Sequence, residues 1–414
     1  MPDPAPTAPE ALSEEGIAAI QRRTVRVLAA GQVLGGIAFG ATVSLGALLA
    51  ADISGEESLS GLATASVTLG ASLCAIPLAR LAARHGRRRA LTLGNLFALV
   101  GIAVVLVAAA LRVFPLLLLG VVLIGAGNAG NLQSRFAATD LSGTGRRGRD
   151  LGTVVWATTV GGVLGPLMLT PGEAIGQAIG MPPLTGAYAF SLVAQLCAFA
   201  LYIVALRPDP LLTAQRIDRD GQRSMSGGAD LDRPRTARYA VFAVAGSHVV
   251  MASVMAMTPV HLAHLAPDHV TLVVGITIAL HVFGMYGLSP LFGLAADRWG
   301  RIPVILAGQA LLAAALVVAA TTPDDQWAVL VSLFLLGLGW SAATVSGAAL
   351  LTESTPIALR PRRQGFSDTA MTLSAAVGAV LAGVVLGWIG YGGLALSALV
   401  LVIAVTVLSP FARR

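Results

Sequence analysis

The stretch Gly293-Leu-Ala-Ala-Asp-Arg-Trp-Gly-Arg301 decides the fold, because part of it is repeated in the first half of the chain. Its last four residues, Arg298-Trp-Gly-Arg301, correspond to Arg84-His-Gly-Arg87 in that half. A second match joins Val160-Gly-Gly-Val-Leu164 to Val377-Gly-Ala-Val-Leu381, with nearly the same separation along the chain. These similar separations indicate two halves with the same architecture, repeated in the same direction.

The composition indicates that both halves lie in a membrane. Of the 414 residues, 56% are hydrophobic and only 12% are charged, whereas soluble domains carry roughly 25% charged residues. Many apolar segments reach the ~20 residues with which an α-helix crosses a bilayer. We therefore predict an all-α membrane protein with twelve transmembrane helices in two pseudo-symmetric six-helix bundles. The predicted spans cover residues 25–51, 59–81, 90–111, 115–137, 151–169, 185–206, 239–262, 270–292, 303–320, 328–350, 365–386 and 392–411.

One long polar segment, residues 207–238, separates the first six predicted spans from the last six. It is rich in arginine and aspartate, and we expect it to be a solvated linker. The predicted domains are therefore an N-terminal tail (1–24), a first bundle (25–206), the linker (207–238) and a second bundle (239–414).

Arginine supplies all 27 basic residues, and its distribution predicts the orientation of the chain. The tail, the linker and alternate loops are rich in arginine, whereas the opposite loops are mainly acidic and carry only Arg112 as a basic residue. Because arginine-rich loops stay in the cytoplasm, we predict a multi-pass protein of the cytoplasmic membrane with both termini inside. Arginines scattered over loops do not form a nucleic-acid surface.

Residues 293–301 resemble the Gly-x-x-x-Asp-Arg-x-Gly-Arg loop motif of the major facilitator superfamily. The resemblance implies a monomeric membrane transporter for a small substrate, not an enzyme, with alternating access to a site between its halves. In that family the aspartate bonds to a neighbouring helix end and closes one side of the transporter. Here Asp297, Arg298 and Arg301 would act in this gate, because Ala79 and Ala83 replace the glycine and the aspartate of the first copy.

Further gating candidates lie toward the cytoplasmic ends of the predicted spans. Arg135 belongs to the fourth span, and Glu353 and Asp368 lie near the tenth and eleventh. A pair between Arg135 and either carboxylate would join the two halves and close the cavity from inside. No carboxylate is expected at mid-membrane depth, so the coupling ion stays open.

Residues 248–285 contain the candidate substrate site, because soft metal ligands recur there at four-residue spacing. Met251 and Met255 share one face of the seventh span, and His281 and Met285 share one face of the eighth. At ~1.5 Å per residue all four lie near the middle of the membrane, with His248 one turn from Met251. Thioethers and imidazole suit Cu(I) and disfavour Mg²⁺ and Ca²⁺. We therefore expect copper as transported cargo, with no resident cofactor.

The same residues resemble the CcoA-like (CalT) branch of the superfamily, whose copper importers carry Met-x-x-x-Met and His-x-x-x-Met in these spans. The resemblance implies copper uptake through Met251, Met255, His281 and Met285. Two alternatives stay open. The first is proton-coupled export of drugs or other small organic compounds, because a motif of such exporters is partly matched by Gly161-Gly-Val-Leu-Gly-Pro166. The second is riboflavin import, because other members of the branch are thought to import riboflavin. A third hypothesis is a non-transporting membrane receptor, but the duplicated halves argue against it.

Overall fold

The computed structural model describes residues 13–56, 59, 61–143, 145–224, 232–265 and 270–412, and the regular elements of this part of the chain are all helices. They are α1 (Glu14–Ser54), α2 (Gly61–His85), α3 (Arg87–Leu111), α4 (Phe114–Ala137), α5 (Arg147–Leu167), α6 (Leu169–Ala178), α7 (Gly186–Ala205), α8 (Pro210–Ser224), α9 (Pro234–Leu265), α10 (Val270–Tyr286), α11 (Ser289–Trp299), α12 (Arg301–Thr321), α13 (Gln326–Glu353), α14 (Arg360–Val407) and the short 3-10 helix η3 (Ser409–Ala412). Among the described residues, nine helical segments are long and apolar enough to cross a membrane. The all-helical prediction is confirmed.

The predicted spans match these helices, with breaks that hydropathy does not reveal. The eighth span consists of α10 and α11, which are separated at residues 287–288. The fifth span ends at Leu167, after which the short helix α6 follows. The last two spans lie in α14, which changes direction at Gly390, where φ is 71°. Glycine suits this position because it has no Cβ to clash in the left-handed region.

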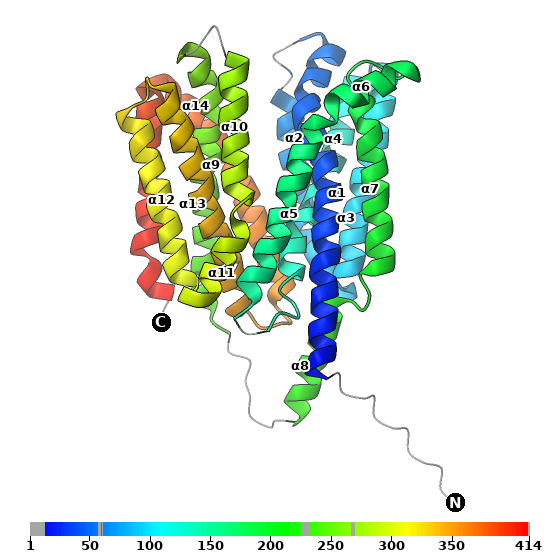
Figure 1. The fold of residues 1–414 in the computed structure, drawn as a ribbon, viewed down its shortest axis with the longest axis vertical. Helices are drawn as coiled ribbons and strands as arrows, with labels where there is room; N and C mark the ends of the chain where they lie inside the picture. The colour runs from blue at the N-terminus through cyan, green and yellow to red at the C-terminus, as the bar shows by residue number, and fades with distance from the viewer. Residues whose placement is uncertain are drawn as a thin grey trace, which may run out of the picture.

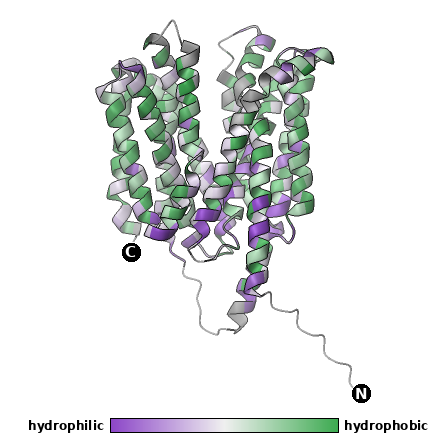
Figure 2. Cartoon of the chain, viewed as in Figure 1, coloured by the Kyte–Doolittle hydropathy of each residue, from purple (hydrophilic) through white to green (hydrophobic). Residues whose placement is uncertain are grey.

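The helices form two bundles that lie side by side (Figure 1), one with α1–α7 and the other with α9–α14. The start of α1, the helix η3 and α8 lie at the same end of the molecule, which we call the terminal end (Figure 1). The bundles approach each other at this end. Hydrophobic residues cover their outer faces, and hydrophilic residues gather near the terminal end (Figure 2).

Each bundle contains an equivalent close helix contact, which shows the repeat in three dimensions. A Cβ on Gly127 would lie 2.9 Å from the carbonyl oxygen of Gly94, where α4 crosses α3. A Cβ on Gly339 would lie 2.8 Å from the carbonyl oxygen of Gly308, where α13 crosses α12. Gly308 follows Gly94 by the same separation that relates the two copies of the loop motif. Small residues permit this approach of two backbones in a membrane.

The predicted linker contains the helix α8, which the sequence analysis did not predict. The carboxylate of Asp209 accepts hydrogen bonds from the backbone N–H groups of Leu211 and Leu212, both 3.1 Å, at the start of α8. The same carboxylate accepts the N–H of Arg88 at 2.7 Å, so α8 is fixed to the start of α3. Leu211 and Ala214 are buried beside Leu141 and Ile357. Only one narrow face of α8 is apolar, which is why composition suggested a solvated segment. Residues 1–12 of the predicted tail and 225–231 of the linker lie outside the described residues.

Candidate functional site: the central cavity and its closed end

A cavity of about 340 Å³ lies between the two bundles, and we call it the central cavity. Helices α1, α2, α4 and α5 of the first bundle line one side, and α9, α10, α13 and α14 of the second bundle line the other. Its size is at the lower end of the ~300–1,000 Å³ that small-molecule sites occupy. Both halves therefore contribute to one site, as the repeat predicts.

The second bundle supplies an aromatic wall, made of Tyr286, Trp340 and His248. The indole Nε1–H of Trp340 donates a hydrogen bond to Nδ1 of His248 at 2.7 Å. The ring of Tyr286 meets that of Trp340 edge-on, with centroids 5.6 Å apart. Since Nδ1 of the neutral imidazole accepts this bond, its proton is on Nε2, which becomes a donor. The wall thus combines flat apolar surfaces with a polar edge.

The first bundle supplies amide and hydroxyl groups opposite this wall. The side-chain amide of Gln32 donates to the carbonyl oxygen of Asn131 at 2.6 Å and also to the hydroxyl of Ser134. The hydroxyl of Thr158 donates to Oε1 of Gln32 at 3.2 Å. Asn128 joins Gln32, Asn131 and Thr158 in the lining. These neutral groups both donate and accept hydrogen bonds.

Arg135 is the one charged residue among the described residues that line the cavity. Its guanidinium donates from Nη2 to Oδ1 of Asp368 and, at 3.9 Å, to the sulfur of Met371. The side chains of Arg135 and Asp368 are only 6% and 0% exposed. Since α4 and α14 belong to different bundles, the Arg135–Asp368 pair joins the halves, in the arrangement expected from the sequence. Glu353 does not pair with Arg135. The gating role of the pair stays a prediction.

The predicted metal ligands lie elsewhere, with one exception. His248 lines the central cavity, but Met251, Met255, His281 and Met285 do not. Met251 and Met285 are buried in the apolar core of the second bundle, and Met255 packs against it. His281 is fully buried; its Nδ1 hydrogen-bonds the carbonyl oxygen of Leu333 at 2.7 Å, and no partner for its Nε2 occurs in the described part of the chain.

This placement corrects the expectation that these four side chains share a site between the halves. Spacing of four residues shows that two side chains share a helix face, but not which neighbour that face meets. Here α10 packs closely on α13, since a Cβ on Gly337 would lie 2.5 Å from the carbonyl oxygen of His281. No group of three or more His, Cys, Asp or Glu side chains suited to a metal ion occurs among the residues described.

A second polar cluster closes the terminal end, where α11 meets α5. The carboxylate of Asp297 accepts the backbone N–H groups of Gly148 and Arg149 at 2.9 and 2.8 Å. These N–H groups belong to the first turn of α5 and have no partner inside the helix. A carboxylate also interacts favourably with the positive end of the helix dipole. Asp297 of the second bundle is therefore bonded to the first bundle.

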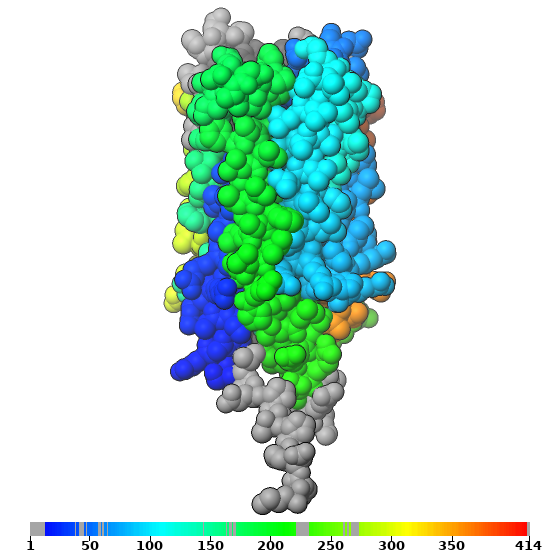
Figure 3. Space-filling model, turned by 90° about the vertical axis from the view of Figure 1, so that its right-hand side faces the viewer, coloured from blue at the N-terminus to red at the C-terminus, as the bar shows by residue number. Residues whose placement is uncertain are grey.

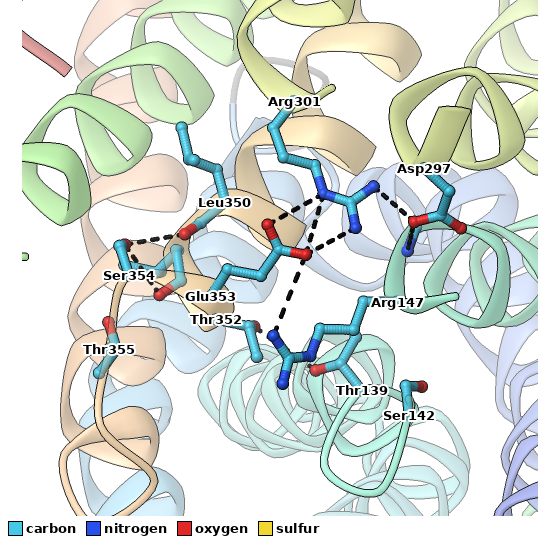
Figure 4. Close-up of polar contacts among 12 residues, drawn as sticks. Thr139, Ser142, Arg147, Asp297, Arg301, Leu350, Thr352, Glu353, Ser354 and Thr355 are labelled. Carbon is cyan, nitrogen blue, oxygen red and sulfur yellow. Dashed lines mark hydrogen bonds and ion pairs between the residues drawn. The ribbon is translucent and has the colours of Figure 1, made fainter. Parts of the chain in front are cut away.

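Arg301 connects this contact to α13 (Figure 4). Its Nη1 donates to Oδ1 of Asp297 at 2.5 Å, and its Nη2 donates to Oε1 of Glu353 at 2.6 Å. Arg147 lies 4.0 Å from the same carboxylate. We call Asp297, Arg301, Glu353 and Arg147 the Asp297 cluster. Arg298 is exposed, and no ion pair involves it among the described residues.

The first copy of the loop motif contains a buried counterpart that the sequence reading missed. Arg87, which corresponds to Arg301, donates from Nε to Asp140 at 2.8 Å and from Nη2 to Oε1 of Gln364 at 2.6 Å. Both charged side chains are at most 1% exposed. The sequence contains a signal for this role of Arg87, because Arg87 and Arg301 are the last residues of the two matched segments. Gln364 belongs to α14, so this network also crosses between the bundles.

Comparisons with known proteins agree with this architecture. The family model of the Major Facilitator Superfamily matches residues 28–286 and 240–414. The uncharacterized MFS-type transporter YddS of Bacillus subtilis (strain 168) is 35% identical over 390 residues, which cover 92% of this chain and 89% of that protein. The riboflavin transporter RfnT of Brucella anthropi is 29% identical over 89% of this chain and 90% of its own length. The crystal structure of the human organic anion transporter MFSD10 (TETRAN) superposes with a TM-score of 0.76 at 18% identity, covering 94% of this chain and 99% of that one. Because the family model matches most of the chain and YddS is 35% identical over 92% of it, the chain belongs to the Major Facilitator Superfamily, whose members are membrane transporters and not enzymes.

Proposed function

We propose that the protein moves a neutral or anionic aromatic molecule across the cytoplasmic membrane through the central cavity. The aromatic wall of Tyr286, Trp340 and His248 carries this proposal, because it faces neutral hydrogen-bonding groups across the cavity. Planar rings stack on such surfaces, while amides and hydroxyls fix their polar edges. The guanidinium of Arg135 favours a negative or electron-rich group.

The comparisons support this substrate class over copper. A protein 29% identical to this chain is named a riboflavin transporter, and riboflavin is neutral, planar and rich in hydrogen-bonding groups. Export of cationic drugs is less well supported. A buried cation requires a compensating carboxylate, and none occurs among the described residues lining the cavity.

We propose alternating access as the mechanism. The Asp297 cluster and the Arg135–Asp368 pair join the bundles at the terminal end, so these contacts break when the cavity opens there. The arginine-rich segments favour a cytoplasmic location for that end. In the present conformation the cavity is then closed to the cytoplasm.

Titration of purified protein with riboflavin, followed by flavin fluorescence, tests the substrate class. Trp340→Ala should weaken binding about tenfold or more, because the loss of a buried aromatic contact costs about 1.5–3 kcal/mol. Trp327→Ala is the matched control, since Trp327 is 65% exposed and lies outside the cavity lining. Equal losses in both variants, or no saturable binding of riboflavin or its anionic phosphate ester, would contradict the proposal.

Copper uptake is the second candidate, and one observation favours it. Nε2 of His281 is buried without a partner among the described residues, in the bundle whose core contains Met251 and Met285. Two thioethers and one imidazole would suit Cu(I). Copper analysis of purified protein tests this candidate: one bound copper that is lost in Met285→Leu and Met251→Leu would support it, and absence of copper in the wild type would reject it.

A further inference from the structure

A groove on the outer surface of the first bundle is distinct from the transport site. It has a volume of about 300 Å³ and lies between the start of α3 and the end of α7. These two helices lie side by side on the face shown in Figure 3, where α7 is green and α3 is light blue to cyan, with α8 below them. Arg88, Arg89 and Arg207 line one part of the groove.

The rest of the groove is apolar. Leu93 and Leu96 line it from α3, and Phe199 and Ile203 line it from α7. On α3 these leucines lie about one to two turns deeper in the membrane than Arg88 and Arg89. On α7, Ile203 and Phe199 precede Arg207 by one and two turns. The groove is thus positively charged at the terminal end and apolar where it continues toward the membrane centre.

The arginines of this groove, Arg88, Arg89 and Arg207, form no ion pair within the part of the chain that the structure describes. The nearby carboxylate of Asp209 accepts backbone N–H groups of α3 and α8 instead. The Nε of Arg207 donates to the carbonyl oxygen of Ile203 at 3.1 Å, which leaves its terminal nitrogens available.

The second half of the chain has no arginines at the equivalent positions. When the two loop motifs are aligned, Ile302 and Pro303 of α12 occupy the positions of Arg88 and Arg89. The second half is oriented by other arginines in the same loop, namely Arg298 and Arg301. Helix α12 thus packs in its bundle without arginines at the positions of Arg88 and Arg89.

We propose that this groove binds an anionic phospholipid of the cytoplasmic leaflet. The lipid phosphate lies among Arg88, Arg89 and Arg207, and one acyl chain lies along Leu93, Leu96, Phe199 and Ile203. Arginine suits the phosphate because its guanidinium presents several donors in one plane. An anionic headgroup also balances the charge of three arginines that have no ion-pair partner among the described residues.

Native mass spectrometry of the full chain with added phosphatidylglycerol or phosphatidylcholine tests the site. We expect one phosphatidylglycerol to bind at least about tenfold more tightly than phosphatidylcholine. The triple variant Arg88→Gln/Arg89→Gln/Arg207→Gln should lose this preference. The control Arg84→Gln/Arg216→Gln/Arg362→Gln removes the same charge from positions outside the groove, near the terminal end, and should keep it. Equal loss in both triple variants, or no preference in the wild type, would overturn the proposal.

Two further measurements separate a lipid from a free anion and from misfolding. Inorganic phosphate at millimolar concentration should not displace the lipid, because it makes no acyl contacts; full displacement would overturn lipid binding. Phosphatidylglycerol should raise the melting temperature of the wild type by mass action. It should raise that of the single variant Arg89→Gln by less, although the two proteins melt alike without lipid. Equal stabilisation of both would contradict the role of the arginines.

Discussion

The Asp297 cluster and the Arg135–Asp368 pair join the same two bundles by different chemistry. At both contacts the helix backbones of the two bundles pack closely and in the same way. A Cβ on Gly148 would collide with the carbonyl oxygen of Gly293, and a Cβ on Gly365 would collide with the Cβ of Ala79. Gly148 aligns with Gly365 in the repeat, and Ala79 aligns with Gly293, so these contacts are copies of one another.

The two contacts use different chemistry because α5 and α14 begin at different positions of the repeat. Helix α5 begins at Arg147, so the N–H groups of Gly148 and Arg149 are free to bind Asp297. Helix α14 begins at Arg360, one turn before Gln364, which corresponds to Arg147 in the repeat. The N–H of Gly365 therefore bonds within its own helix. A carboxylate at position 83 would find no free donor there, which explains why alanine is tolerated.

On this second side a buried ion pair replaces the helix-end contact. Asp368 occupies the position that Leu151, a fully buried apolar residue, occupies in the other half. The repeat thus shows that packing alone does not require a charge there. Since buried ion pairs bring little net stability, we infer that the pair serves the opening and closing of the cavity.

Spin labels in a variant without Cys74 and Cys197 measure the two contacts separately. Labels at Arg146 and Trp299, which are both exposed, report on the α5–α11 side. Labels at Arg84 and Arg362, also exposed, report on the α2–α14 side.

The largest effect is expected from Asp368→Asn, which leaves the buried guanidinium of Arg135 without a counter-charge. Breaking one partner of a buried pair costs about 3–5 kcal/mol, equivalent to a shift of roughly 10²- to 5 × 10³-fold toward the state open at the terminal end. Transport should be nearly abolished, and the Arg84–Arg362 label distance should increase. The double variant Arg135→Gln/Asp368→Asn should recover part of the closed population. Neutralising the exposed Arg112–Asp52 pair with Arg112→Gln is the control, and an equal effect there would refute the assignment.

Asp297→Asn should have a smaller effect, because it removes a charge but keeps an oxygen that accepts the N–H groups of α5. The loss of a helix N-terminal carboxylate contact costs about 0.5–2 kcal/mol. The Arg146–Trp299 distance should broaden and transport should fall, while riboflavin binding stays nearly unchanged. Equal loss of transport and binding would instead indicate misfolding.

Ala83→Asp tests the comparison from the other side. It restores the carboxylate that the loop motif has at Asp297, but α14 offers no free N–H group to donate to it. We therefore expect no strengthening of closure, seen as an unchanged Arg84–Arg362 distance distribution. A larger closed population would show that the position at which α14 begins does not account for the difference.

The smallest effect is expected from Arg363→Gln at the terminal end. Arg363 donates to Asp232 at 2.6 Å, and this hydrogen bond holds the pKa of the exposed Asp232 carboxyl below its usual range. A lowered pKa means that the contact is present above about pH 4 and is lost only as the pH falls further. Transport of the wild type and of this variant should therefore match between about pH 5 and pH 8, because exposed pairs contribute little. A clear difference within that range would give the contact a role in opening.

Much of the fold could be predicted from the sequence, because membrane spans depend on the length and hydropathy of short segments. The repeat at residues 84–87 and 298–301 also predicted the two-bundle arrangement. Helix α8 was missed, since its stability comes from Asp209 and from a narrow buried face. The break between α10 and α11 depends on packing that no local pattern reports.

The site could be predicted only in part. The sequence predicted that Arg135 pairs with either Glu353 or Asp368, because all three lie toward the cytoplasmic ends of their spans; the structure shows Asp368 as the partner. The aromatic wall was not predicted, because Trp340 and Tyr286 are far apart in the sequence and meet only through the crossing of α10 and α13. For Met251 and His281, helical spacing was read correctly, but the direction of the shared face was not available from the sequence.

The most direct test compares riboflavin and Cu(I) on one preparation of purified protein. Each ligand is titrated into the wild type, Trp340→Ala and Met285→Leu. The proposed function predicts saturable riboflavin binding that Trp340→Ala weakens about tenfold or more and Met285→Leu leaves unchanged. A single bound copper that Met285→Leu removes, together with no riboflavin binding by the wild type, would contradict it.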